Sequence, residues 1–264
     1  MKIKLLILTL AAHLCLSLLS CSKDKEQDES SESFTSEAPA DTEVSSLYTT
    51  LLCESEDRGM SYIDSFIFIG ESTTYHMKSR GVLSGGTETK QIWSPKSGTM
   101  TLDLTADKIK IVYPETDEEL TFFEAAKRKR PEYIIMTFGL NGAVQNINRG
   151  EDYFKACYKK LINAIKSASP NTKIILQSAF PVAENMDMSD YSVDLKTLNE
   201  YIDTINEWTY TLAEQEKLRY LDTAEILKDN NNNLKPEYQS GDGYHLTEQA
   251  YKQILYYIRT HGYS

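Results

Sequence analysis

Short apolar runs alternate with longer amphipathic segments along most of this chain. Three runs are almost continuously apolar and lie between polar, proline or glycine residues, as in strands that are buried on both faces, at 65–69, 133–138 and 173–177. Two segments that follow them have clear helical periodicity, at 152–168 and 195–216. Because strands alternate with helices, we expect an α/β fold, in which right-handed crossovers build a parallel sheet into a three-layer α/β/α sandwich.

The remaining elements are expected to be shorter. Three short strands are predicted, at 91–93, 109–113 and 219–221, and the second alternates like an exposed strand. Three further helices are predicted, at 73–80, at 121–130 with a capping box at its start, and at 247–261. All of these elements are expected to belong to one domain, residues 47–264, which is long enough to bury a core of its own.

The first twenty residues have the composition of a targeting segment. Two lysines come before an apolar stretch at 5–19, which is shorter than the roughly 20 residues of a membrane-spanning helix and is closed by small residues. This pattern predicts a secretory signal peptide at 1–20. Its end, Leu18-Leu19-Ser20-Cys21, resembles the lipobox of bacterial lipoproteins. The resemblance implies that Cys21 carries a lipid; the alternative is an unmodified cysteine after a secretory signal.

Residues 21–46 differ from both of their neighbours. After Cys21 they are rich in Ser, Glu and Asp and contain almost no aliphatic side chains, so they cannot bury enough surface to offset the entropy of ordering. We expect a lipidated Cys21 followed by a flexible acidic tether. The two N-terminal segments together predict an extracytoplasmic lipoprotein, anchored to the membrane at Cys21 with its domain at the cell surface.

The charge of the chain argues against nucleic acid as a partner. The net charge is −11, from 28 Lys and Arg against 39 Asp and Glu, and no stripe of basic residues with interleaved aromatics is present. The basic run 127–130 falls at the end of a predicted helix, where cations offset the helix dipole.

No metal site is expected from the cysteines. Cys53 and Cys157 remain beyond the signal peptide and the lipidated cysteine, and neither has metal-ligand spacing to a histidine. A disulfide between them is possible but not implied. The asparagine-rich segment 229–233 lacks the glycine and the closing glutamate of a calcium loop.

A serine stands at the point where the first buried strand ends. In Gly70-Glu71-Ser72 the serine would gain N–H donors from the turn and from the start of the next helix, and ligands bind at this end of an open α/β sheet. The motif alone also fits an ordinary turn with a helix cap. Ser72 is therefore a candidate nucleophile that needs partners elsewhere in the chain.

Two residues in the loop before the last helix could activate this serine. Asp242 stands three residues before His245, so its carboxylate could hold the imidazole Nδ1–H and leave Nε2 free to accept a proton. The other two histidines of the domain are interpreted differently. His76 is taken as a surface or partly packed residue, and His261 as part of a frayed helix end.

Two further candidates follow strands and could stabilise a developing oxyanion. Asn141, after the strand at 133–138, could donate from its side-chain amide, although an asparagine also suits a tight turn. Gly98, in the loop after 91–93, could bring its N–H close to a ligand because it has no Cβ. The alternative for Gly98 is an ordinary turn glycine.

In their order along the chain, these residues resemble the four sequence blocks of the SGNH (GDSL-type) hydrolase family. Residues 68–72 resemble the first block, 96–98 the second, 139–141 the third and 242–246 the last. The resemblance covers essentially all of residues 60–262. It implies a flavodoxin-like fold around a mostly parallel five-stranded sheet, and a serine esterase that acts without a metal or any other cofactor.

The resemblance also implies a role for each residue. Ser72 would attack the ester carbonyl, His245 would take its proton and pass it to the leaving alcohol, and Asp242 would orient His245. The backbone N–H groups of Ser72 and Gly98 and the side-chain amide of Asn141 would form the oxyanion hole.

One residue departs from the family's pattern. The first block usually reads Gly-Asp-Ser, and here Glu71 takes the place of the aspartate. Glu71 keeps the charge and adds a methylene, so we interpret it as a supporting residue, the triad acid being Asp242. Its extra length could shift the loop that carries Ser72.

The expected substrate is an acyl ester, and the predicted location favours acetyl esters of an extracellular carbohydrate. The alternatives are a weak or inactive hydrolase-like lipoprotein that binds glycans, a carbohydrate O-acetyltransferase with the same triad, and a lipase or lysophospholipase, for which no long apolar lid is evident. Trp93, Tyr75 and Phe180 could line the acyl or sugar site, or could belong to the packing.

Overall fold

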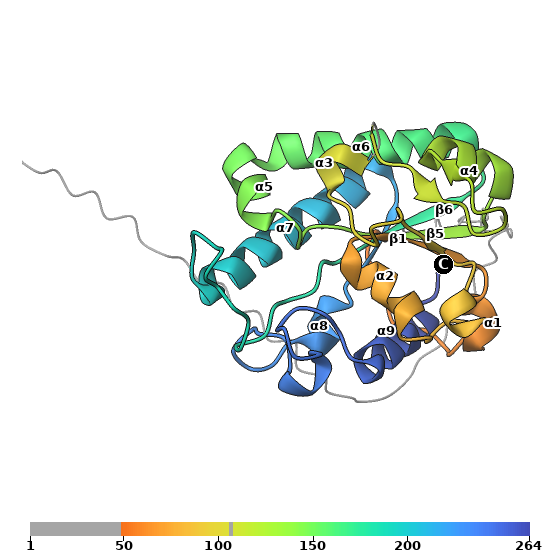
Figure 1. Ribbon diagram of the computed structural model, residues 1–264. Helices are drawn as coiled ribbons and strands as arrows, with labels where there is room; N and C mark the ends of the chain where they lie inside the picture. Colours follow the sequence, from red (N-terminus) through yellow and green to blue (C-terminus); the bar gives the residue numbers. More distant parts are fainter. Residues whose placement is uncertain (1–48, 106–107) are drawn as a thin grey trace, which may run out of the picture. The chain divides into compact units, whose positions relative to one another are not determined.

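The computed structural model describes residues 49–105 and 108–264 (Figure 1). The predicted signal peptide at 1–20, the lipidation site at Cys21 and the tether up to residue 46 lie outside the described residues. Within the described part, no helix combines the length and the apolar character needed to span a bilayer.

Five parallel strands form one sheet, in the order β2-β1-β5-β6-β7. The α/β prediction with a mostly parallel five-stranded sheet is confirmed. β1 and β5 are neighbours, and Gly70 at the end of β1 pairs in register with Thr137 at the end of β5. The chain therefore leaves both strands at adjacent points of the same edge. The strand bounds are Phe66–Gly70 (β1), Ile92–Trp93 (β2), Tyr133–Thr137 (β5), Lys173–Gln177 (β6) and Arg219–Leu221 (β7).

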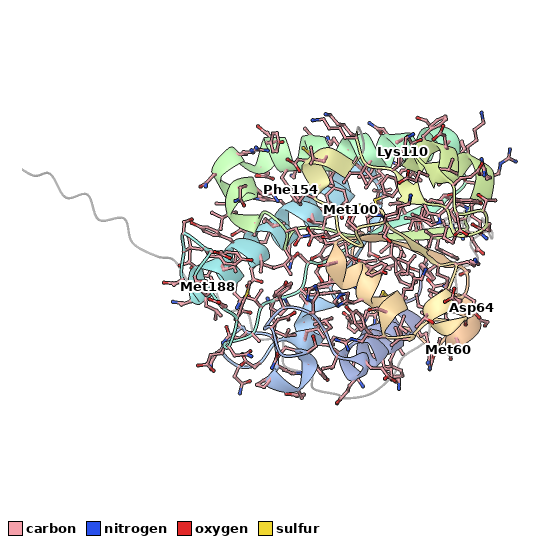
Figure 2. The ribbon with its side chains drawn as sticks, viewed as in Figure 1. Met60, Asp64, Met100, Lys110, Phe154 and Met188 are labelled. Atoms are coloured by element: carbon pink, nitrogen blue, oxygen red, sulfur yellow. The ribbon has the colours of Figure 1, made fainter. Side chains whose placement is uncertain are left out.

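Helices cover both faces of this sheet (Figure 1), and Figure 2 draws the side chains in the same view. One apolar core lies between the sheet and α3 (Leu102–Thr105), α4 (Phe122–Lys129), α5 (Ala143–Arg149), α6 (Glu151–Ala168) and α7 (Leu195–Glu216). The other lies between the sheet and α1 (Gly59–Ile63), α2 (Ser72–Ser79), α8 (Ala224–Leu227) and α9 (Glu248–Thr260). Two single 3₁₀ turns, η1 (Gly86–Glu88) and η2 (Pro236–Tyr238), lie in loops.

The residues of β1 show why the strands had to be apolar throughout. Ile67 and Ile69 pack into the core under α4 and α6, whereas Phe66 and Phe68 pack into the core under α1 and α9. Successive side chains of a strand point to opposite faces, so a strand covered on both sides has no exposed position.

Side-chain caps fix where the longer helices begin. The predicted capping box is present at the start of α4. The Thr121 side chain accepts the Glu124 N–H, and the Glu124 side chain accepts the Thr121 N–H. The Asp194 side chain accepts from Thr197 N–H at the start of α7, and the Thr247 side chain accepts from Ala250 N–H at the start of α9. Each such cap stabilises its helix by about 1 kcal/mol. The Thr247 cap fixes the start of α9 and therefore the end of the loop that carries His245.

One expected strand differs from the sequence prediction. Only Ile111–Val112 (β3) of residues 109–113 is extended, and it pairs antiparallel with Glu119–Leu120 (β4) in a separate two-stranded sheet. The expectation of an exposed strand is wrong for Ile111, which is fully buried in the core that also holds Trp93 and Phe122. Alternation of apolar and polar residues predicts a strand with one covered face. Here the face that carries Ile111 packs into the core that lies under α4 and α6.

The two cysteines of the domain do not pair. Cys53 is exposed, Cys157 is buried in α6, and both are free thiols. The helices α1, α3, α5 and α8 were not predicted; they are short, and a helix of one or two turns has too few residues to show a period.

Candidate active site

Ser72 is the first residue of α2, and only Glu71 separates it from Gly70 at the end of β1. The chain can turn there because Gly70 has no side chain. A Cβ on Gly70 would collide with the Thr74 side chain and the Thr137 carbonyl oxygen. Backbone N–H groups in the first turn of a helix have no intrahelical acceptor. The position therefore offers both a hydroxyl and unused donors at the edge of the sheet.

Ser72, His245 and Asp242 are brought together from the two ends of the domain. Ser72 Oγ lies 2.9 Å from His245 Nε2, and His245 Nδ1 lies 2.6 Å from Asp242 Oδ2. The other carboxylate oxygen, Asp242 Oδ1, accepts the backbone N–H of His245 at 2.9 Å and of Tyr244 at 3.1 Å. With Nδ1–H directed at the carboxylate, Nε2 presents its lone pair to the serine hydroxyl.

The carboxylate of Asp242 is held in its charged form. Burial disfavours ionisation of Asp242, but the hydrogen bonds from the His245 backbone, the His245 ring and the Tyr244 backbone outweigh it, and the pKa of the carboxyl lies below its ordinary value. A charged partner at Nδ1 stabilises the imidazolium that forms when Nε2 takes a proton.

His76 stacks on His245, a contact that the sequence did not suggest. The two rings lie 4.0 Å apart between centroids at 27°, and Tyr244 lies 4.1 Å from the same ring at 41°. His76 Nδ1 is buried and has no hydrogen-bond partner among the described residues. Burial, then the nearby His245, lowers the pKa of His76, so its ring is neutral where it faces the candidate base. His76 is thus partly packed, as one of the two sequence interpretations had it, and the structure adds that it packs on the candidate base.

Glu71 connects the loop after β1 to the loop after β5. Its side chain is almost completely buried, and its two oxygens accept the backbone N–H groups of Gly139 and Asn141, each at 3.0 Å. Burial raises the pKa of Glu71 to about 7 even though these N–H groups favour the charged form. The residue that departs from the usual Gly-Asp-Ser pattern thus fixes the backbone of the next candidate, Asn141.

The Asn141 side chain is itself held in place. Its amide nitrogen donates to Thr99 Oγ1 at 3.1 Å and to the Met100 carbonyl oxygen at 3.2 Å, both in the loop that also contains Gly98. Gly98 has φ +71° and lies against the Tyr75 ring, where a Cβ would come within 2.8 Å of Cδ1. The Gly98 N–H donates to the Pro95 carbonyl oxygen at 2.9 Å, so this predicted oxyanion donor is engaged in its own turn.

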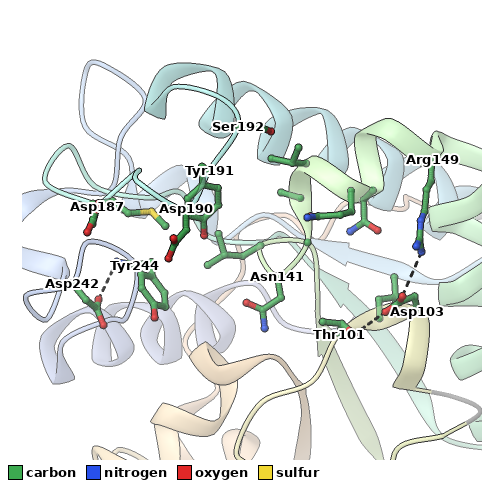
Figure 3. Close-up of a pocket in the computed structure, with 18 of the residues that line it drawn as sticks. Thr101, Asp103, Asn141, Arg149, Asp187, Asp190, Tyr191, Ser192, Asp242 and Tyr244 are labelled. Atoms are coloured by element: carbon green, nitrogen blue, oxygen red, sulfur yellow. Dashed lines mark hydrogen bonds and ion pairs between the residues drawn. The ribbon is translucent and has the colours of Figure 1, made fainter.

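A cavity of about 990 Å³ adjoins the Asp242 side of the triad, and Ser72 and His245 are not among the residues that line it (Figure 3). Asn141 and Asp242 lie on its wall, and so do Tyr244 and Tyr191. Of the aromatics considered for the site, Trp93 and Phe180 are buried in the two cores, so the packing interpretation holds for these two. Tyr75 is partly exposed and lies against Gly98, next to the candidate site. Tyr191 and Tyr244 lie in loops with no strand or helix pattern, which is why the sequence did not single them out.

No group of three or more His, Cys, Asp or Glu side chains suited to hold a metal occurs among residues 49–105 and 108–264. The site described here consists of a hydroxyl, an imidazole, a carboxylate and backbone or amide donors.

Comparison with known proteins identifies the family of this chain. The model of the GDSL-like lipase/acylhydrolase family matches residues 68–253, a stretch that contains Ser72, Gly98, Asn141, Asp242 and His245. The chain belongs to this family. Membership supports a hydrolase of the esterase class. No curated protein matches the chain.

Solved structures agree on the fold. A Streptococcus pneumonia protein provisionally described as a platelet activating factor has 19% identity and a TM-score of 0.51, over 81% of this chain and 85% of that chain. A protein from Desulfitobacterium hafniense, provisionally described as a lipolytic protein of the G-D-S-L family, has 19% identity and a TM-score of 0.50, over 74% of this chain and 97% of that chain. At such identities the likeness concerns the fold alone.

Proposed function

We propose that this GDSL-family protein is a serine esterase that hydrolyses acyl esters, with acetyl esters of carbohydrates as the natural class. The proposal rests on one observation, the pair of hydrogen bonds that joins Ser72 Oγ to His245 Nε2 and His245 Nδ1 to Asp242 Oδ2. Hydroxyl, base and orienting acid in this sequence are the parts that a nucleophilic serine needs.

The first half of the reaction acylates the enzyme. Ser72 Oγ attacks the carbonyl carbon while its proton moves to His245 Nε2, and the carbonyl oxygen becomes an oxyanion. The imidazolium, stabilised by Asp242, then gives this proton to the oxygen of the leaving alcohol as the bond between that oxygen and the carbonyl carbon breaks. The acyl group stays on Ser72.

The second half returns the enzyme to its starting state. Water attacks the acyl carbon while one of its protons moves to His245 Nε2. The tetrahedral intermediate collapses, the bond to Ser72 Oγ breaks, and this oxygen takes the proton from the imidazolium as the carboxylic acid leaves.

Three groups are candidate donors to the oxyanion, and two of them make other hydrogen bonds in this structure. The Ser72 N–H lies at the start of α2. The Asn141 amide follows the neighbouring strand β5 and can donate once it leaves Thr99 Oγ1 or the Met100 carbonyl oxygen. The Gly98 N–H joins them once it leaves the Pro95 carbonyl oxygen. Loss of one such donor lowers kcat by about 10²–10³-fold.

The cavity beside the triad supports a polar leaving group. Its wall carries asparagine, glutamine, serine, threonine and tyrosine side chains together with charged ones. Many convergent donors and acceptors, with two tyrosine rings among them, suit a sugar better than a long acyl chain. The predicted lipid anchor at Cys21 would place this activity outside the cytoplasm, at the membrane surface.

The test is hydrolysis of 4-nitrophenyl acetate by the purified protein. The wild type is expected to turn over, Ser72→Ala and His245→Ala to lose at least about 10³-fold in kcat, and the control Ser167→Ala, an exposed serine on α6, to retain full activity. If wild type and Ser72→Ala hydrolyse this ester and acetylated glycans equally slowly, the esterase proposal fails and the glycan-binding alternative gains support.

A further inference from the structure

The cavity beside the triad is unbalanced in charge. Among the described residues that line it are four carboxylates, Asp103, Asp187, Asp190 and Asp242, and a single Lys or Arg side chain, that of Arg149. Arg149 Nη1 lies 3.4 Å from Asp103 Oδ2, so these two charges offset each other on one side of the cavity. The excess of negative charge therefore belongs to the other side.

That side is formed by the segment before α7 and the loop that carries His245. Figure 3 shows Asp187, Asp190 and Tyr191 beside Tyr244 and Asp242, away from the Arg149–Asp103 pair. From 183 to 195 the chain contains four acidic residues and no Lys or Arg. No Lys or Arg of this segment can therefore neutralise Asp187 or Asp190, the two aspartates of the segment that line the cavity.

Asp187 and Asp190 of this segment are both exposed, and both line the cavity. Asp187 accepts the Ser189 N–H at 2.9 Å, and this bond holds the pKa of its carboxyl below the ordinary value, so Asp187 is charged near neutral pH. Asp190 is also exposed and lines the cavity, with its carboxylate drawn near Tyr191 and Tyr244 in Figure 3. Asp242, the third carboxylate, is engaged with His245.

We propose that this cavity receives the alcohol part of the ester and selects it by charge, with Asp187 and Asp190 as the specificity-determining residues. Sugars that are uncharged or carry an amine are accepted, the amine-bearing ones best, and sugars that carry a carboxylate or phosphate are rejected. The inference rests on the proposed function, because the cavity matters to a substrate only if Ser72 reacts beside it.

The expected size of this preference follows from the Coulomb energy of charges in partly solvated surroundings. Two carboxylates a few ångströms from the bound sugar, in a dielectric close to that of water, favour a cation over an anion on the order of tenfold in kcat/KM at low salt. The preference should shrink as salt is added, because the Debye length falls from about 30 Å at 0.01 M to about 3 Å at 1 M.

The test compares three acetyl esters with the acetyl group on the same oxygen, the 4-O-acetyl derivatives of methyl glucosaminide, methyl glucoside and methyl glucuronoside, whose rings carry a cation, no charge and an anion. For the wild type at low salt, kcat/KM is expected to fall in that order. In the double variant Asp187→Asn/Asp190→Asn the ratio between the cationic and anionic ester is expected to fall at least about threefold. Asparagine keeps the acceptor that Ser189 N–H needs, so the loop is retained.

A matched control removes two charges elsewhere. Glu54→Gln/Glu207→Gln changes two exposed glutamates that lie off the cavity wall and is expected to leave the ratio unchanged. A wild-type ratio near one, or an equal change in both double variants, would overturn the inference, because the selection would then be absent or due to net charge alone.

Binding to Ser72→Ala separates this inference from the proposed function. Glucosamine, glucose and glucuronate are titrated into the variant and followed by NMR shifts. If the wild type hydrolyses no ester but glucosamine still binds more tightly than glucuronate, the esterase proposal fails and the charge selection stands. Equal affinities would overturn the charge selection even in an active enzyme.

Discussion

At the scale of single residues, Glu71 shows how one methylene can be accommodated. A carboxylate one atom longer than aspartate reaches both the Gly139 and Asn141 N–H groups and binds the loop after β5 without a change in charge. The sequence identified Glu71 as a departure and a supporting residue. Its partners depend on the pairing of β1 with β5, which a local pattern does not specify.

The raised pKa of Glu71 makes stability depend on pH. The carboxyl has a pKa of about 7 in the folded protein and about 4.5 when unfolded, so the folded state binds the proton more tightly. The stabilisation from this proton is complete below about pH 4.5 and is lost as pH rises through 7. Relative to Glu71→Gln, the free energy of unfolding of the wild type should fall by up to about 3 kcal/mol between pH 4.5 and 8.

Urea denaturation of both proteins across this range measures the difference. A constant offset between wild type and Glu71→Gln would show that Glu71 has an ordinary pKa. Asp57, which is exposed and paired with Arg259, gives a control variant, Asp57→Asn, whose offset should not vary in this window because its pKa is about 2.

The catalytic candidates could be predicted because each belongs to a local signal. Ser72 and Asn141 follow buried strands, and Asp242 precedes His245 at a spacing that permits a hydrogen bond. His76 could not be assigned in this way. Its position on α2 is evident from the sequence, but its contact with His245 exists only when the last loop folds back on α2.

At the scale of elements, two loops that build the site depend on each other. The Ala183 N–H donates to the Gly243 carbonyl oxygen at 2.7 Å, which joins the segment after β6 to the loop that carries Asp242 and His245. Gly243 has φ +87°, and a Cβ there would lie 2.5 Å from Met186 Cα. The glycine thus permits the close approach of the two loops.

Gly243→Ala should therefore disturb the site more than the fold. We expect kcat to fall by up to about 10²-fold, because the loop must move and carry His245 with it, while the far-UV circular dichroism is retained. Gly241→Ala is the matched control, since φ is +118° but no atom lies within 4 Å of the added Cβ. Equal losses in the two variants would attribute the effect to backbone strain and contradict the coupling.

Elements with complete local signals were predicted well, and the very short ones were not. The predicted strand 133–138 is extended over 133–137 in the sheet, and the predicted strand 173–177 over its full length. β3 and β4 are neighbours in the sequence, but each has only two residues, too few to show a period. The burial of Ile111 depends on core residues that come from distant parts of the chain. The alternation at 109–113 indicated an extended segment without indicating what would cover it.

At the scale of the whole domain, the alternation of strands and helices was sufficient for the fold class. The cavity was not predictable, because its walls come from α3, α5 and the loops after β2, β5 and β6, together with the loop before α9, and the positions of these segments follow from the completed sandwich. In α/β proteins, the segments that bind ligands converge at the carboxyl ends of the parallel strands.

Covalent labelling of Ser72 tests the central claim most directly. A fluorophosphonate reacts with a serine hydroxyl only when a base and an oxyanion site activate it. We expect peptide mass spectrometry of the treated wild type to find one adduct, on Ser72, with labelling abolished in Ser72→Ala and strongly slowed in His245→Ala. Labelling that is absent from the wild type, or that persists unchanged in Ser72→Ala, would contradict the account.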